Sequence, residues 1–276
     1  MKRIFTFLFR LKYRFILRPI FFLFDSEKIH NFLVACGSLL GRIAFARWII
    51  GLFLRVENRS LEQEIAGVFF KNPVGLSAGF DYDAKLTKIL PALSFGFGTV
   101  GTITNKPYAG NPEPRLGRLP KSKSLLVNKG FKNNGIKHLV EMHHRSLFEI
   151  PIGLSLGKTN CAEPMTQGEA VADVVEAFTA AEKAKMNFSY YELNISCPNL
   201  RGNVEFYEPQ HLRELLTAVC GLGLSKPVFI KMPIDKTDEE TRAMLDLIAE
   251  FPIRGVIFGN LQRNRAHTTI DQAEAS

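Results

Sequence analysis

Mainly apolar runs of a few residues recur along the chain from Glu64 onward, and stretches with helical patterning separate several of them. A short run of this kind is typical of a parallel strand that is buried on both faces. The runs cover residues 74–78, 98–103, 152–156, 191–196, 228–232 and 255–258. The helical stretches cover residues 168–186, 210–220 and 238–251. Strands that alternate with helices predict an α/β fold.

Two arrangements of such strands compete: an open doubly wound sheet and a closed (β/α)8 barrel. No GxGxxG follows the first strand, which weighs against a dinucleotide-binding open sheet. Polar residues and glycines instead gather directly after the strands, where barrels build their active sites. A closed barrel needs about eight strands, and the chain offers about six. We therefore predict an incomplete (β/α)8 TIM barrel over residues 64–276, which begins with a small hairpin at 65–73.

The N-terminal segment differs from this body in charge and composition. Residues 1–55 carry ten Lys or Arg against two Asp or Glu, which accounts for the +8 formal charge of the chain. Phenylalanines and basic residues alternate in the first 24 positions, and the uncharged stretches are too short to cross a bilayer. Apolar side chains of amphipathic helices enter the lipid interface while Lys and Arg meet anionic headgroups. We therefore predict a helical module at 1–56 that contacts a bilayer surface; helices packed on the chain's own domain, or a mitochondrial targeting peptide, are the alternatives.

The helices of this segment have recognisable boundaries. Pro19 predicts a bend or an end in the first helix, because proline lacks a backbone N–H. Asp25 and Ser26 are good N-caps, so we expect the second helix from about Ser26. It is predicted to continue in pieces as far as Leu52.

Charge and cysteine spacing exclude several classes of protein. Basic and acidic residues beyond position 55 are equal in number, whereas a body that binds nucleic acid is expected to be basic. Nucleic acid is therefore not an expected partner. None of the cysteine pairs has CxxC spacing, which argues against a zinc site or a redox dithiol, so we predict no metal site. Cysteines without a disulfide pattern favour a reducing cytoplasm.

The segment from Asn194 to Asn199 carries the clearest chemical signal. It reads Asn-Ile-Ser-Cys-Pro-Asn and follows a predicted buried strand. The two asparagine amides can donate and accept hydrogen bonds around a planar polar ring. Cys197 lies between them, and a thiol with a reference pKa of about 8.5 can take a proton from a bound substrate. Lone cysteines are often simply buried in a core, but the flanking asparagines favour a role as a base.

This segment resembles the active-site loop of the dihydroorotate dehydrogenases, and other stretches agree with that family in order and spacing. They are residues 71–81, 96–104, 110–116, 128–135 and the pair Ile230-Lys231. The match spans about residues 25–260, and the combination is far more specific than any single stretch. The resemblance implies an FMN-dependent barrel enzyme that oxidises (S)-dihydroorotate to orotate in de novo pyrimidine (UMP) biosynthesis.

The resemblance also implies a role for each matching residue. Cys197 would be the base that removes the C5 proton of dihydroorotate, and FMN would accept the hydride from C6. The implied substrate-binding residues are Asn128, Gly130, Phe131, Asn194, Asn199 and Asn260. The implied FMN-binding residues are Ala78, Gly79, Thr102, Ser155, Asn194 and Lys231. Lys231 would place positive charge near the N1–C2=O edge of the flavin, where reduced flavin is anionic.

The basic, aromatic N-terminus resembles the membrane-bound, quinone-reducing branch of the family. Residues 24–30 are similar to the junction between the helices of that branch. The implied partners are a membrane quinone and, through residues 1–55, a bilayer surface. The implied location is peripheral, on the cytoplasmic face of a bacterial inner membrane. That branch normally uses serine as its base, so Cys197 leaves a soluble, fumarate- or NAD-linked enzyme open as an alternative.

Some positions depart from the family pattern. Tyr82 stands where the family usually has a lysine that reaches substrate and flavin, and Lys85 could replace it from one helical turn later. Ser155 stands where asparagine is common, and the loop before Gly130 is one residue short. No Gly-rich phosphate loops follow Asn260. We therefore expect a fragment of a longer enzyme, or a catalytically incompetent truncated remnant, that binds FMN poorly.

Overall fold

The computed structural model describes residues 2–202, 204–261, 263–264, 266–267 and 269–275, so residues 1 and 276 of the two predicted domains lie outside it. Its main sheet has six parallel strands in the order β10-β9-β8-β7-β4-β3. These strands are β3 (Gly75–Leu76), β4 (Phe97–Ile103), β7 (Ile152–Leu156), β8 (Tyr190–Asn194), β9 (Val228–Met232) and β10 (Gly255–Phe258). Each of them overlaps one predicted run, so the predicted strands are confirmed.

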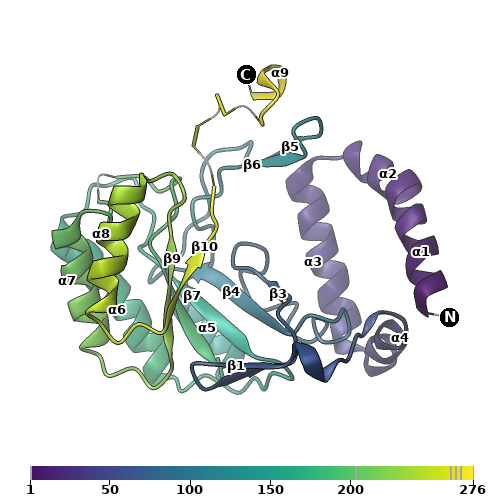
Figure 1. Ribbon diagram of the computed structural model, residues 1–276, viewed down its shortest axis with the longest axis horizontal. Coiled ribbons are helices and arrows are strands. Elements are labelled where there is room, and N and C mark those ends of the chain that lie inside the picture. Colours follow the sequence, from purple (N-terminus) through teal and green to yellow (C-terminus); the bar gives the residue numbers. More distant parts are fainter. Residues whose placement is uncertain (1, 203, 262, 265, 268, 276) are drawn as a thin grey trace.

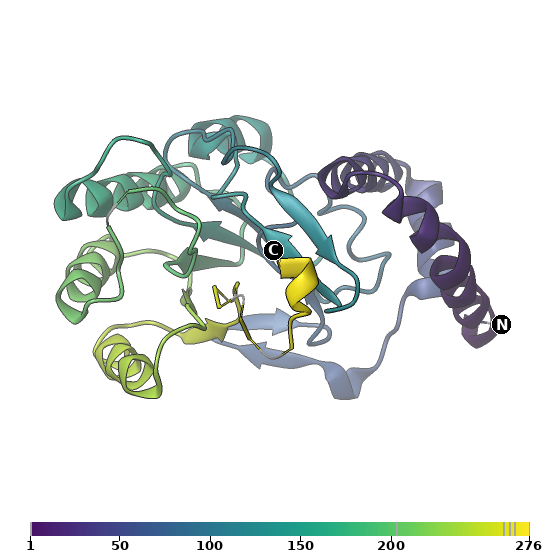
Figure 2. The same cartoon turned by 90° about the horizontal axis from the view of Figure 1, so that it is seen from above.

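The sheet is curved and open. Figure 1 shows helices α6, α7 and α8 along one side of it, and the view from above in Figure 2 shows the strands as part of a barrel wall with helices outside. The helices of this outer layer are α5 (Gly135–His143), α6 (Gln167–Lys183), α7 (Pro209–Cys220) and α8 (Asp238–Ala249). Within the described ranges, β3 and β10 each pair on one side only. The predicted incomplete barrel is confirmed in this form.

The main hydrophobic core lies between the sheet and these helices. Leu154 and Leu193 from the strands pack there with Phe178 of α6 and Leu215 of α7, and all four are fully buried. The first turn of α8 is fixed by a capping box at Thr237, which agrees with its predicted acidic start. Burial of apolar strand and helix faces against each other therefore holds the open sheet in shape.

A small hairpin closes the interior of the sheet at the amino ends of the strands. It consists of β1 (Gln63–Ile65) and β2 (Val68–Phe70), as predicted. The Phe70 ring lies 5.3 Å from Phe97 and 6.3 Å from Tyr190, which in turn lies 5.6 Å from Phe229. We call these four rings the aromatic floor. It lies at the amino ends of β4, β8 and β9.

The first helices form one continuous run. α1 (Lys2–Lys12) passes through a π-helical turn (Tyr13–Leu17) into α2 (Arg18–Phe22). Of the predicted bend or end at Pro19, the end is therefore wrong, and the bend stays a prediction. In a regular α-helix the ring of Pro19 would clash with the backbone carbonyl group one turn earlier. The wider π-helical turn makes room for this ring. α3 (Ser26–Arg42) begins as predicted, because Asp25 accepts a hydrogen bond from Lys28 N. α4 (Ala44–Leu54) is the expected second piece.

The helices α1–α4 expose many large apolar side chains. Phe7, Phe15, Leu23, Phe45 and Trp48 are each more than half exposed. Figure 1 shows α3 between the barrel and the run of α1 and α2. None of the described helices alone is long and apolar enough to cross a bilayer. The pair α3 and α4, which is bent by 106°, is long and apolar enough only when the two helices are counted together.

Several elements of the structure were not predicted from the sequence. A hairpin of β5 (Leu116–Leu119) and β6 (Ser124–Val127) stands apart from the main sheet, at the top of Figure 1. The short helix α9 (Gln272–Ala275) lies at its turn, where Glu274 accepts hydrogen bonds from the backbone N–H groups of Lys121 and Ser122 at 2.8 and 2.9 Å. Helix α5, which follows this hairpin, was also missed.

Candidate active site

A cavity of about 470 Å³ opens at the carboxyl ends of the strands. It is bordered by the ends of β3, β4, β8 and β9 and by the segment after β10. Ten of the predicted site residues line it: Ala78, Gly79, Thr102, Gly130, Phe131, Asn194, Cys197, Asn199, Lys231 and Asn260. The parallel sheet explains this convergence, because the carboxyl ends of parallel strands meet along one edge.

Asn194 ends β8 and is held by both ends of its amide. Its Nδ2 donates to Thr102 Oγ1 at 2.7 Å, and its Oδ1 accepts from Ser196 N and Oγ at 3.1 and 2.8 Å. Asn260 Nδ2 donates to the carbonyl oxygen of Ser196 at 2.6 Å. These bonds tie the turn after β8 to its neighbours on both sides. The amide of Asn194 is therefore fixed in orientation before any ligand binds.

Asn199 connects the same turn to the β5–β6 hairpin. Its Nδ2 donates to the carbonyl oxygen of Val127 at 2.7 Å, and its own carbonyl oxygen accepts from Asn111 Nδ2 at 2.9 Å. Asn111 Nδ2 also donates to Asn128 Oδ1 at 2.8 Å. Asn128 thus supports the loop beside the cavity and is not among the residues that line it. Its contact with substrate stays a prediction.

Cys197 is partly exposed in the cavity. The surrounding protein nevertheless removes water from its thiol, and this burial raises its pKa to about 11. A backbone hydrogen bond at Asn199 and the positive charges of Lys231 and Arg263 act in the opposite direction. The thiol is therefore protonated at neutral pH even with those cations nearby, and a base at this position needs a bound ligand to favour its thiolate.

Lys231 and Glu192 are buried side chains of opposite charge on neighbouring strands. Lys231 is 8% exposed near the end of β9, and Glu192 is 2% exposed in β8. Burial raises the pKa of Glu192, whereas Lys231 and a hydrogen bond from Ser155 Oγ at 2.7 Å lower it. Ser155 Oγ also lies 2.9 Å from Thr102 Oγ1. Ser155 therefore lies below the cavity lining and links two interior side chains, and its flavin contact stays a prediction.

Two residues of the cavity carry polar groups that form neither a hydrogen bond nor an ion pair within the described part of the chain. Tyr82 Oη is buried and has no hydrogen-bond partner among the residues that the structure describes. Lys129 is 7% exposed, and its Nζ lies 5.0 Å from the centroid of the Tyr82 ring. Burial lowers the pKa of the Lys129 ammonium group. Lys129 was missed as a site residue, although the loop that carries it was singled out by its resemblance.

Lys85 does not take the position suggested for it. Its side chain is 54% exposed, and its Nζ pairs with Asp83 at 2.9 Å. It is not part of the cavity lining. The helical turn that was expected to bring it back toward the site is replaced by backbone hydrogen bonds from Lys85 and Leu86 to the Asp81 carboxylate. These bonds fix the loop with Lys85 facing solvent.

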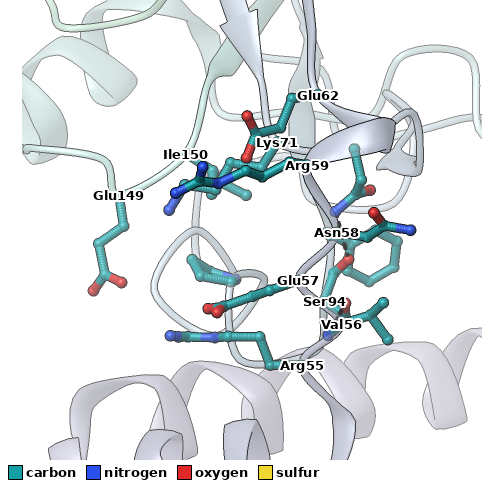
Figure 3. Close-up of a pocket in the computed structure, with 13 residues that line it drawn as sticks. Arg55, Val56, Glu57, Asn58, Arg59, Glu62, Lys71, Ser94, Glu149 and Ile150 are labelled. Atoms are coloured by element: carbon teal, nitrogen blue, oxygen red, sulfur yellow. Dashed lines mark hydrogen bonds between the residues drawn. The ribbon is translucent and has the colours of Figure 1, made fainter.

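A second cavity, also of about 470 Å³, lies at the amino ends of β3, β4 and β7. Figure 3 shows Arg55, Glu57 and Arg59 on the segment after α4, with Glu149 on the opposite side. Acidic and basic side chains alternate around it, and none of the predicted site residues lies there. The chemistry expected from the sequence is therefore confined to the carboxyl edge.

The comparisons with known proteins agree with this geometry. A family model described as Dihydroorotate dehydrogenase matches residues 60–275. A protein from Rhodococcus erythropolis named "Dihydroorotate dehydrogenase (quinone)" is 32% identical, over 95% of this chain and 71% of its own length. A protein of the same name from Christiangramia forsetii is 34% identical, over 92% of this chain and 74% of its own length.

A solved structure has the same fold. The crystal structure of ligand-free type DHODH from Eimeria tenella superimposes with a TM-score of 0.75 and 26% identity. The superposition covers 91% of this chain and 73% of the other. With the family match over most of its length and a cavity at the expected edge of the sheet, the chain belongs to the dihydroorotate dehydrogenase family.

Proposed function

We propose that the protein oxidises (S)-dihydroorotate to orotate, with FMN as cofactor and a quinone as electron acceptor, in pyrimidine biosynthesis. The observation that carries this proposal is the convergence of Asn194, Cys197, Asn199 and Asn260 on one cavity. The amides form a polar rim that suits a pyrimidine ring, and Cys197 supplies a titratable group among them. The names of the relatives favour the quinone-linked form of the reaction.

The residues present suit the ring portion of a flavin. Lys231 is a buried cation at the cavity and has no ion pair among the described residues, so it can face the electron-rich edge of a flavin ring. Ala78, Gly79 and Thr102 would hold the ring with it, and Asn194 would contact both ring and substrate. FMN, when bound, supplies a hydride acceptor for C6 of dihydroorotate. Cys197 would take the C5 proton, while Asn199 and Asn260 keep the substrate ring in place.

A separate cavity supports the choice of a quinone. It has a volume of about 430 Å³ and lies between α3 and the loop after β3. Phe80 and Tyr82 line both this cavity and the one that contains Cys197. His30 of α3 lies 2.9 Å, through Nε2, from the carbonyl oxygen of Phe80. An apolar acceptor that enters beside α3 would thus reach the far side of the loop that borders the reaction site.

The exposed apolar side chains of α1–α4 support a membrane location for this acceptor. We propose residues 1–56 as a module that rests on the cytoplasmic face of a bacterial inner membrane, with the body at 64–276 beside it. Phenylalanine and leucine side chains would enter the lipid interface, and the ten basic residues of positions 1–55 would bind anionic headgroups. Vesicle flotation tests this: the chain should float with anionic vesicles at low salt and remain in solution with neutral ones.

Replacement of Cys197 tests the proposed reaction. We expect Cys197→Ala to slow flavin reduction by dihydroorotate by about 10²- to 10⁴-fold, which is the usual contribution of a general base. The measurement is the loss of flavin absorbance near roughly 450 nm in the chain supplied with FMN. Cys197→Ser keeps a hydroxyl group and should retain more activity than Cys197→Ala. Equal rates in the wild type and Cys197→Ala would exclude this role.

The pH dependence gives an independent test of the same group. Because the pKa of the thiol is about 11, the thiolate fraction rises about tenfold per pH unit below that value. Flavin reduction in the wild type should therefore accelerate from pH 6 to pH 9, whereas Cys197→Ala, which has no titrating group at this position, should lose this dependence. A flat profile in the wild type would mean that another group takes the proton.

A choice of acceptors distinguishes the two branches of the family. A short-chain ubiquinone analogue should reoxidise the reduced flavin, and fumarate and NAD should not. Turnover with fumarate or NAD alone would favour the soluble type that Cys197 leaves open.

A further inference from the structure

The cavity that contains Cys197 holds an unbalanced positive charge. Lys129 is more than nine-tenths buried, and the described residues offer its Nζ no ion pair. A buried ammonium group without a counter-ion is costly, because it loses its hydration without an equivalent interaction in return. The cost disappears when an anion enters the cavity and binds Nζ. The free protein therefore carries a feature that favours an anionic ligand.

The carboxylate whose charge acts on Lys129 already pairs with other groups. Glu27 of α3 pairs with Arg115 Nε at 2.9 Å and with Lys132 Nζ at 3.0 Å. The charge of Glu27 still favours the protonated form of Lys129, but Lys132 and Arg115 oppose it, and burial is the largest influence on the pKa of Lys129. Arg115 also pairs with Glu113 at 2.6 Å, so both carboxylates are held by cations other than Lys129. A negatively charged ligand would therefore not have to displace a protein carboxylate from Lys129.

Tyr82 adds a neutral donor beside this cation. Its Oη is buried and lacks a partner among the described residues, and both Tyr82 and Lys129 line the same cavity. The Lys129 Nζ lies 5.0 Å from the centroid of the Tyr82 ring, so the ring holds the ammonium group through a cation–π contact. A buried hydroxyl without a partner also costs free energy, and a ligand oxygen would satisfy it. A negatively charged ligand oxygen would therefore satisfy both the ammonium group of Lys129 and the hydroxyl group of Tyr82.

We propose that Lys129 Nζ and Tyr82 Oη form an anion subsite that binds the carboxylate of dihydroorotate and orotate. The assignment of this ligand rests on the proposed function, whereas the subsite itself rests on burial and on the missing partners. Lys129 makes a charge-assisted hydrogen bond to one carboxylate oxygen, and Tyr82 donates its hydroxyl proton to the other. Tyr82 thus serves as a substrate-binding residue, where the family usually has lysine, and the required cation comes from the loop after β6.

The test compares two ligands that share a ring and differ in charge. Orotate carries a carboxylate, and uracil is the same ring without it. Binding of each to the full chain supplied with FMN is measured by equilibrium dialysis, for the wild type and for Lys129→Met, Tyr82→Phe and Lys85→Met. We expect Lys129→Met to weaken orotate binding about 10- to 100-fold and Tyr82→Phe about 2- to 10-fold, from the usual strengths of charged and neutral hydrogen bonds. Uracil binding should stay the same in all four proteins.

The matched control is Lys85→Met, which removes an exposed lysine that is paired with Asp83. It should leave orotate binding unchanged, and a loss in this variant would contradict the assignment to Lys129. Lys129→Met should melt at least as high as the wild type without ligand, because it removes an unpaired buried charge. This measurement separates lost binding from lost folding.

A third ligand separates failure of the subsite from failure of the proposed function. Benzoate is a planar carboxylate without the pyrimidine groups, and it should raise the melting temperature of the wild type but not of Lys129→Met. If the wild type neither binds nor oxidises its pyrimidine substrates but keeps this benzoate effect, the proposed function fails and the anion subsite stands. If orotate and benzoate act equally on the wild type and Lys129→Met, or on neither, the subsite is wrong.

Discussion

Strand β8 presents two different surfaces to the two sides of the sheet. On the outer side, Tyr191 and Leu193 are buried in the main core, where the Tyr191 ring lies 5.4 Å from Phe178 of α6. On the inner side, Tyr190 belongs to the aromatic floor, Glu192 lies above it, and Asn194 reaches the cavity. The outer surface packs into the apolar core, with one polar contact from the Tyr191 hydroxyl to Glu182, whereas the inner one becomes polar toward the carboxyl end. Stability and chemistry are thus divided between alternate residues of one strand.

The largest effect on stability is expected from the outer surface. Leu193→Ala removes a fully buried side chain from the main core and should lower the free energy of unfolding by about 2–5 kcal/mol. Urea denaturation measures this change. The affinity of the molecules that remain folded for orotate should be unchanged. If Leu193→Ala lost affinity for orotate but kept its stability, the outer surface would serve ligand binding and not stability, contrary to this comparison.

A smaller effect is expected from the aromatic floor. Tyr190→Phe keeps the ring but removes the hydroxyl, which lies 2.8 Å from Thr99 Oγ1. The same hydroxyl donates to the carbonyl oxygen of Gly98 at 3.3 Å. Because these two buried hydrogen bonds are lost, the free energy of unfolding should fall by about 1–2 kcal/mol. Urea denaturation of Tyr190→Phe beside the wild type checks this value. A fall as large as that of Leu193→Ala would show that the floor, and not the outer core, holds the sheet together.

The smallest effect is expected from Glu192, in the way the free energy of unfolding changes with pH. Burial raises the pKa of Glu192, so the folded protein holds a proton that the unfolded chain has already released. The stability that this proton provides is present at low pH and is lost as pH rises from about 4.5 through the raised pKa. Glu192→Gln should lack this decline when unfolding is measured between pH 4 and pH 8.

An exposed carboxylate provides the control for the Glu192 measurement. The pKa of Glu250 is lowered by its hydrogen bonds to Arg213, so its contribution is lost as pH falls. Glu250→Gln should therefore change the pH dependence of the free energy of unfolding in the direction opposite to that of Glu192→Gln. The same sign in both variants would mean that Glu192 is not titrating inside the sheet.

The outer surface explains how much of the fold could be predicted from the sequence. The strands β7, β9 and β10 have the predicted boundaries, because each is a short apolar run between polar turns. The β5–β6 hairpin escaped prediction because it has almost no buried residues: of its eight, Leu119 alone is buried. Its position depends on contacts with distant segments, such as α3 and the end of the chain.

The site was predictable where residues follow strands and less so where loops meet. Asn194 and Lys231 end buried strands, so their place at the cavity follows from the topology alone. Lys129 belongs to a loop, and its burial against Tyr82 joins segments that are distant in sequence. Lysines are usually exposed, so the burial of Lys129 could not be recognised from composition or spacing.

Glu27 gives the N-terminal helices a part in the chemistry of the barrel. This carboxylate of α3 holds Arg115, which precedes β5, and Lys132, which follows β6. Any force that shifts α3, such as its seating in a lipid surface, would therefore change the charge around the reaction cavity. An exchange of the N-terminal segment between relatives would alter substrate affinity as well as location, unless the acidic residue and its two basic partners were inherited together.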